Sequence, residues 1–103
     1  MPSRTIDLSA LQQSAGKAAA LLRAVGNERR LMLLCLLIEQ GEMTAGQLAE
    51  GVGLSASASS QHLAKMRDEG LITFRRESQT LHYRIADPSV RRLIKLLRDI
   101  YCP

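Results

Sequence analysis

Aromatic residues are scarce in this sequence, which contains no tryptophan, one phenylalanine and two tyrosines. Proteins that hold single-stranded nucleic acids stack the bases on aromatic side chains. Phe74, Tyr83 and Tyr101 are too few to build such a platform. The core must therefore be aliphatic, filled mainly by leucine, alanine and isoleucine.

Long apolar runs are also absent. The longest run, residues 31–38, is far shorter than the about 18 apolar residues that a transmembrane helix needs. Residues 1–7 include Arg4, but no apolar stretch or small-residue cleavage site follows directly, so we expect no secretory signal. Together these observations predict a cytoplasmic protein without a membrane partner.

A length of 103 residues leaves room for one domain, spanning residues 1–103. The apolar fraction of 46% and the charged fraction of 23% are ordinary for a globular domain, which excludes a disordered tail or a collagen-like repeat. A domain of this size buries only roughly two-thirds of its unfolded surface, so an oligomer interface would support its thin core.

The charge balance is basic. Lysine and arginine total 14 against 10 acidic residues, for a net charge of +4, and arginine is in large excess over lysine. The planar guanidinium group suits bidentate contacts with phosphates or base edges. This balance favours a polyanionic partner such as nucleic acid, although a mildly basic domain without that role fits the charge equally well.

Apolar spacing and capping signals divide the chain into short elements. Helices are predicted over residues 7–25, 28–40, 44–51, 55–69 and 88–102, with a β-hairpin over residues 71–86. Asn27 can cap the second helix, and Thr44 with Gln47 has the spacing of a capping box. Asp87 before Pro88 is a strong start signal for the last helix.

This order, α-α-α-α-β-β-α, predicts a mainly helical winged helix-turn-helix domain. The helix-turn-helix would occupy residues 44–69, and the hairpin at residues 71–86 would be the wing. The outer helices, residues 7–25 and 88–102, have wide apolar faces that the small middle of the domain cannot fully cover. We expect these two helices to form a homodimer interface.

The helix over residues 55–69 has two contrasting sides. Successive turns of about 100° place Ser59, Leu63 and Met66 together, facing the core. The opposite side is small and polar and consists of Ser57, Ser60, Gln61 and Ala64. Such a face can enter the major groove of double-stranded DNA, where Gln pairs with adenine and Ser contacts bases or phosphates. A face that is merely solvated would favour Glu and Lys over so many serines, which are poor helix formers.

Further polar groups flank this face. Lys65 and Arg67 can reach the DNA backbone. His62 lies toward the edge of the core face, so packing is the favoured interpretation of this residue and a DNA contact is the alternative. The hairpin carries its own set at and beside the tip, namely Arg75, Arg76, Gln79 and Arg84. These side chains could meet phosphates or a minor groove, with a solvated basic hairpin as the alternative.

Cysteine is nearly absent: the chain has only Cys35 and Cys102. In a reducing compartment a permanent disulfide is not expected, and a switchable pair remains open. Taken singly, Cys35 fits a buried small hydrophobe and Cys102 an idle terminal thiol. Arg98 would favour the Cys102 thiolate while burial and the helix C-terminus would oppose it, and Glu39 with apolar neighbours would make Cys35 the slower nucleophile.

Residues 54–71, LSASASSQHLAKMRDEGL, resemble the recognition-helix segment of the ArsR/SmtB family of bacterial repressors, with its S-x-H-L and L-R-x-x-G-L pattern. Residues 27–31 resemble that family's entry to the second helix, and residues 81–84 resemble its wing. Ser59 departs from the pattern, because a more apolar residue is expected there. The resemblance runs from about residue 21 to the C-terminus and implies a dimeric winged-helix repressor.

Members of this family typically release DNA when a metal binds. One of their sites places Cys-x-Cys in the helix that corresponds to residues 44–51, and this chain has no cysteine there. Another places Asp and His on the last helix, and residues 88–103 contain no histidine. We therefore expect no metal site and no cofactor.

The placement of Cys35 in the second helix and of Cys102 at the end of the last, within Tyr101-Cys-Pro103, resembles the persulfide-sensing BigR/SqrR/HlyU-like branch of the family. In that branch a disulfide or polysulfide bridge joins the two thiols within one subunit and the protein releases DNA. The resemblance implies operator DNA as partner and a low-molecular-weight persulfide or polysulfide as inducer.

Other functions stay open at this point. The same repressor could respond to peroxide, haem or an unusual metal site, or the winged helix could serve protein contacts alone. A small thiol enzyme is the remaining alternative, but the chain lacks a Cys-x-x-Cys pair, a phosphate-binding loop and a base beside either cysteine. We therefore expect no enzymatic activity.

Overall fold

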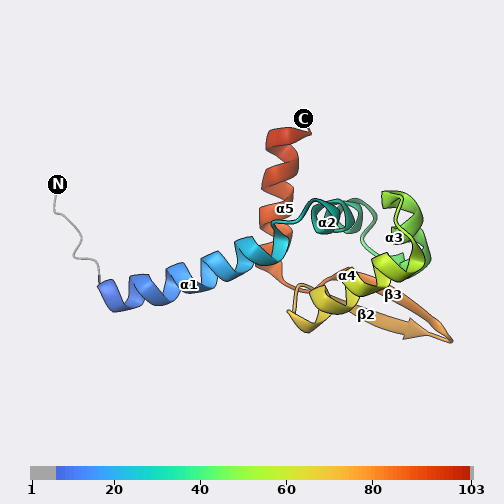
Figure 1. Cartoon of the computed structure of the whole chain (residues 1–103), viewed down its shortest axis with the longest axis horizontal. Coiled ribbons are helices and arrows are strands. Elements are labelled where there is room, and N and C mark those ends of the chain that lie inside the picture. Colours follow the sequence, from blue (N-terminus) through green and yellow to red (C-terminus); the bar gives the residue numbers. More distant parts are fainter. Residues whose placement is uncertain (1–6, 103) are drawn as a thin grey trace.

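A long first helix, α1 (Leu8–Val25), leads away from the other elements, which pack around the second helix, α2 (Glu28–Gln40) (Figure 1). The computed structural model describes residues 7–102. The remaining elements are β1 (Met43–Thr44), α3 (Ala45–Val52), α4 (Ala56–Asp68), β2 (Ile72–Glu77), β3 (Thr80–Ile85) and α5 (Pro88–Tyr101). The mainly helical fold with a hairpin wing is confirmed, whereas the expectation about residues 1–6 and the Pro103 ending lie outside the described residues.

The helix starts follow the capping residues that the sequence predicts. The Asn27 side chain accepts a hydrogen bond from the backbone N–H of Arg30 at 3.1 Å. Thr44 and Gln47 form both bonds of the capping box, at 3.2 and 3.0 Å. Asp87 caps α5 with a 2.8 Å bond from the N–H of Ser89. These bonds satisfy amides that have no partner within their own helix, so the boundaries are set locally.

The sheet has one strand more than expected. Strands β2 and β3 form the predicted antiparallel hairpin, in which Ile72 pairs with Ile85, and the turn is shorter than predicted because Glu77 still pairs with Thr80. The short strand β1 adds to the free edge of β3, where Met43 pairs with Tyr83. The element order is therefore α-α-β-α-α-β-β-α, and the order predicted from the sequence was wrong in omitting β1.

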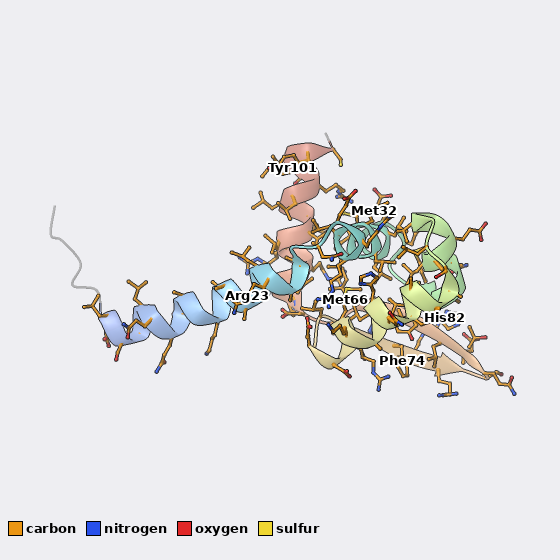
Figure 2. The ribbon with its side chains drawn as sticks, viewed as in Figure 1. Arg23, Met32, Met66, Phe74, His82 and Tyr101 are labelled. Atoms are coloured by element: carbon orange, nitrogen blue, oxygen red, sulfur yellow. The ribbon has the colours of Figure 1, made fainter. Side chains whose placement is uncertain are left out.

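The core is aliphatic, as the scarcity of aromatic residues predicts. Helix α2 lies at its centre with Leu33, Leu34 and Leu37 fully buried. Leu63 of α4 packs into the same cluster, as does Met66, which is labelled in Figure 2. The helix-turn-helix, α3 and α4, is therefore fixed on α2, while β2 continues from the end of α4 as the wing. This arrangement presents the outer side of α4 beside the hairpin.

Helices α1 and α5 leave large apolar side chains uncovered. Only the last turns of α1 join the core, through Val25, with Leu21 and Ala24 packed against it. The exposed large apolar residues of the two helices are Leu8, Leu11, Leu22, Leu96, Ile100 and Tyr101. Both helices extend from the body of the molecule in Figure 1. Their apolar sides are thus available to another surface.

Ser59 is the departure from the family pattern, and it is fully buried with its hydroxyl lacking a hydrogen-bond partner among the described residues. Burial of an unsatisfied hydroxyl costs about 1–3 kcal/mol, and alanine is the better helix former by about 0.5 kcal/mol. We expect Ser59→Ala to raise the free energy of unfolding by about 1–2 kcal/mol, measured in urea at a fixed protein concentration. The matched variant Ser60→Ala, at an exposed site of the same helix, should gain no more than about 0.5 kcal/mol. Equal gains in the two variants would contradict this account.

Candidate nucleic-acid interface and thiol groove

Helix α4 has the two sides that the sequence predicts. Ser59, Leu63 and Met66 are buried against the core. The outer side is exposed along its length and consists of Ser57, Ser60, Gln61 and Ala64. His62 is half-buried at the margin between the two sides, in keeping with its interpretation as a packing residue. The capping serine, Ser55, holds the N–H of Ala58 at 3.1 Å and orders the first turn of this face.

Arg67 lies against the wing. Its guanidinium carbon is 4.3 Å from the centroid of the Phe74 ring, a cation–π contact. Phe74 in turn meets Tyr83 edge to face, with ring centroids 5.5 Å apart. Two of the few aromatic residues therefore anchor the last turn of α4 to the hairpin. Lys65 remains exposed beside the polar face.

The arginines of the wing divide between the two faces of the hairpin. The strand register places Arg76 on the face of Phe74, and Arg75 on the opposite face with His82 and Arg84. The Arg75 guanidinium donates to both oxygens of Glu42 at 3.0 Å and to Glu77 at 3.0 Å. The hydrogen bond that Arg75 donates to Glu77, followed by the one that it donates to Glu42, raises the pKa of Arg75. Arg75 is thus already paired with carboxylates, while Arg76 makes no ion pair within residues 7–102.

Gln79 lies in the hairpin turn with Ser78, and both are exposed. Ser78 adopts a positive φ of 57°, a conformation that short turn residues tolerate. The tip of the wing is therefore a tight two-residue turn, flanked by Glu77 as well as by Arg76. Its charge is more mixed than a count of arginines suggests.

The two cysteines open onto one groove. Cys35 is half-buried on α2, and Cys102 is exposed at the C-terminal cap of α5. Both thiols are free and line an open groove of about 700 Å³, which is formed mainly by α2 and the end of α3, with Cys102 at its edge. Its walls are largely apolar and include Leu31, Met32 and Leu36. Cys102 is exposed, so the expectation that it is buried was wrong: the end of α5 extends beyond the body of the molecule (Figure 1).

Burial raises the pKa of the Cys35 thiol, and the nearby Cys102 raises it further. Arg98 acts in the opposite direction and lowers this pKa, while Glu39 adds a smaller upward shift. The raised pKa disfavours the thiolate form of Cys35 at neutral pH, in the direction that Glu39 and the apolar neighbours predict. The two thiols are also close enough to affect each other electrostatically.

A buried arginine on α2 was not recognised in the sequence. Arg30 is only 9% exposed, and its Nη1 donates to the backbone carbonyl of Ala24 at 2.7 Å and to the Glu69 carboxylate at 3.1 Å. A second open groove, of about 850 Å³, borders this pair and is lined by His62 and Lys65 among others. The NERRL segment signals a helix start, but nothing in it predicts which of its two arginines turns inward.

Two further findings bear on function. None of the helices in the described part of the chain is long and apolar enough to cross a membrane. Within residues 7–102 no three His, Cys, Asp or Glu side chains gather in a group that could hold a metal ion.

A helix-turn-helix with a small polar outer face, fixed beside a basic hairpin, defines a winged-helix DNA-binding domain. Residues 27–73 match the model of the bacterial regulatory protein, arsR family. The chain is 48% identical over 97 residues to the HTH-type transcriptional regulator YgaV of Escherichia coli, covering 94% of this chain and 98% of the relative. The chain belongs to the arsR family and is a DNA-binding transcriptional regulator.

Solved structures agree with this assignment. Reduced HlyU from Vibrio cholerae superposes with a TM-score of 0.86 at 41% identity, covering 91% of this chain and 98% of that one. The transcriptional repressor BigR from Xylella fastidiosa superposes with a TM-score of 0.82 at 30% identity, covering 95% and 99%. The resemblance to the BigR/HlyU-like branch is confirmed.

Proposed function

We propose that this chain is a homodimeric repressor that leaves its operator when sulfane sulfur bridges Cys35 to Cys102 within one subunit. The observation that carries the proposal is that both cysteines of the chain line one apolar groove, from two different helices. A bridge there would restrain α2 against α5. The likeness to reduced HlyU and to the repressor BigR adds support.

The exposed thiol at Cys102 begins the chemistry. Its thiolate attacks the terminal sulfur of a hydropersulfide RSSH, which forms a Cys102 persulfide and releases the thiol RSH after proton uptake. The Cys35 thiolate then attacks the cysteine-bound sulfur and expels hydrosulfide, leaving a disulfide. If a second sulfur has been added first, attack on the middle sulfur gives a trisulfide and hydrosulfide. The two thiols are oxidised, and one sulfane sulfur is reduced to sulfide.

The groove explains why sulfur would be preferred to peroxide. A direct disulfide needs Cα atoms within about 7 Å, whereas inserted sulfur atoms extend the reach of the bridge. Apolar walls formed by Leu31, Met32 and Leu36 suit polarisable sulfur chains more than they suit water or hydrogen peroxide. Cys35 and Cys102 are the residues on which the response depends.

DNA binding rests on the outer side of α4, with Ser57, Ser60, Gln61 and Lys65 toward the major groove. A dimer reads two half-sites only when its recognition helices are about 34 Å apart. Because α5 contributes both to the thiol groove and to the proposed dimer interface, a bridge to α2 would change that spacing. A small rotation is enough to weaken binding.

Intact mass after anaerobic exposure to glutathione persulfide, with hydrogen peroxide in parallel, tests the proposal. We expect persulfide to add sulfur in a bridge between Cys35 and Cys102, and peroxide not to do so. Because the Cys35 pKa is raised, its thiolate is the minor form at neutral pH and grows about tenfold per pH unit. The open Cys102 persulfide should therefore accumulate near pH 6.5, and the bridge should close faster as pH rises to 8.5.

An unchanged mass, or the same simple disulfide from both reagents, would remove the persulfide claim. Bridge closure that is independent of pH would contradict the role assigned to the Cys35 thiolate. A DNA-binding regulator with a peroxide, haem or metal inducer would remain.

The wing offers a matched pair of variants for the DNA side. Arg76 is unpaired within the described residues, whereas Arg75 is already bound to Glu42 and Glu77. We expect Arg76→Gln to weaken binding to a selected operator about tenfold and to reduce the slope of affinity against salt, because a phosphate contact is lost in each subunit. Arg75→Gln should change affinity less than about threefold at 0.15 M salt, where exposed charges are screened. Equal losses would show that the ion pairs do not withhold Arg75 from DNA.

A further inference from the structure

One buried guanidinium group joins three helices. Arg30, in the first turn of α2, donates to the Ala24 carbonyl at the end of α1 and to the Glu69 carboxylate at the C-terminal cap of α4. The same helix, α2, carries Cys35 five residues further on, about 7.5 Å along the axis. The recognition helix is thus tied directly to the helix that bears a thiol.

The two side chains of this ion pair differ in their exposure to solvent. The Arg30 side chain is 10% exposed, whereas that of Glu69 is 40% exposed and borders an open groove. If α2 shifts, Glu69 can exchange Arg30 for water, while Arg30 keeps its bond to the Ala24 carbonyl. In that step Arg30 keeps one hydrogen-bond acceptor and loses its only carboxylate partner within residues 7–102. Only the Arg30 end of the pair is buried, so breaking the link costs less than it would for a pair that is buried at both ends.

The last turn of α4 is held from its two sides. Glu69 connects it to α2, and Arg67 rests on Phe74 of the wing. The contact with the wing stays in place when α2 moves, because β2 follows α4 directly in the chain. A change in the Arg30–Glu69 contact therefore alters how α4 and the wing sit on α2.

We propose that Arg30 and Glu69 are a positioning pair that transmits the bridging of Cys35 and Cys102 to the recognition helix. Restraint of α2 against α5 displaces Arg30, and the C-terminal end of α4 loses the orientation that Glu69 maintains. The pair acts after the sulfur chemistry and touches neither thiol. This inference rests on the proposed function.

Glu69→Ala is the decisive variant, because it removes the only carboxylate that Arg30 contacts within residues 7–102, and urea unfolding verifies that it stays folded. The matched control is Asp68→Ala, which removes the same charge from the neighbouring exposed position, where no ion pair forms within residues 7–102. Each protein is bridged with glutathione persulfide, its crosslink is quantified by intact mass, and its affinity for the selected operator is measured by fluorescence anisotropy in the reduced and bridged forms.

We expect bridging to weaken operator binding about tenfold or more in the wild type and in Asp68→Ala. In Glu69→Ala the crosslink should be complete, but the ratio of the two affinities should fall below about threefold. Glu69→Gln should lie between them, because its amide oxygen still accepts from Arg30. Such a graded ratio is not expected from a residue that only supports stability.

Three results would overturn the pairing. Bridging could weaken the operator binding of Glu69→Ala as much as that of the wild type. Asp68→Ala could lose the effect of bridging on operator affinity as fully as Glu69→Ala is expected to, or Glu69→Ala could fail to form the crosslink. A wild-type protein that is fully bridged and still binds its operator would instead overturn the proposed function, and the inference with it. The wild-type measurement therefore separates the two failures.

Discussion

Cys35→Ser and Cys102→Ser should each stay on the operator at a persulfide concentration that releases the wild-type protein. A serine oxygen cannot take part in a sulfur bridge, so either variant loses the whole restraint between α2 and α5. Persulfide should weaken the operator affinity of the wild type about tenfold or more, which is within the usual range of coupling between two sites. The operator affinity of each variant should hardly change. Fluorescence anisotropy with a labelled operator, before and after treatment, measures the ratio.

The two variants should differ in chemistry while agreeing in DNA binding. Cys35→Ser keeps the exposed Cys102 and should accumulate its persulfide without a crosslink. Cys102→Ser keeps only the half-buried thiol with the raised pKa, so it should take up sulfur slowly. In dithiothreitol both should bind the operator as the wild type does, which is the control for folding. Full release of either variant by persulfide would refute the bridge as the signal.

The helix boundaries and faces were predictable because their causes are local. Asn27, Thr44 and Asp87 each bond to an amide two or three residues away, so the sequence alone contains both partners. The buried and exposed sides of α4 follow from helical periodicity in the same way. Ser59 could also be recognised as unusual from the sequence, because a polar residue at a position that faces the core is a local inconsistency.

Strand β1 was missed because the residues with which it pairs are distant in the sequence. Two residues, Met43 and Thr44, give no period-two pattern, and they become a strand only by pairing with Tyr83 and His82 of β3. Thr44 is at the same time the cap of α3, which is the stronger local signal. A strand of this length exists only through its partner.

The charges were the least predictable part of the site. A count of arginines treats all of them as available to a polyanion, but Arg75 is bound by Glu42, and Arg30 is turned inward to Glu69. Glu42 and Glu69 lie 33 and 39 residues away from the arginines that they bind. Only the fold decides which cations stay free, and it leaves Arg76 and Lys65 exposed.

The meeting of the thiols shows a similar limit. Cys35 and Cys102 lie 67 residues apart in the sequence, and the family resemblance, rather than spacing, implied their pairing. The fold brings both cysteines to one largely apolar groove over α2 and the end of α3, which supports the proposed pairing. The apolar stripe of α5 does not reveal that the end of this helix extends past the body of the molecule, where Cys102 is exposed.

Disruption of the proposed dimer should have the largest effect on DNA binding. Leu22 on α1 is 59% exposed in the single chain, so Leu22→Asp costs the fold of one subunit little but places a charge within the apolar side of α1. We expect the variant to be monomeric at about 10 μM and to bind the operator at least about a hundredfold more weakly. Linked half-sites gain about 10²–10⁴ in avidity, and a monomer forfeits that gain.

Gln13→Asp is the matched control, because Gln13 lies about 170° around α1 from the apolar stripe and receives the same charge. This variant should remain a dimer and keep most of its affinity. Analytical ultracentrifugation gives the oligomeric state, circular dichroism verifies the helical content, and anisotropy gives the operator affinity. If Leu22→Asp stayed dimeric and bound DNA normally, the apolar side of α1 would need another partner, and the spacing of the recognition helices would have to be set elsewhere.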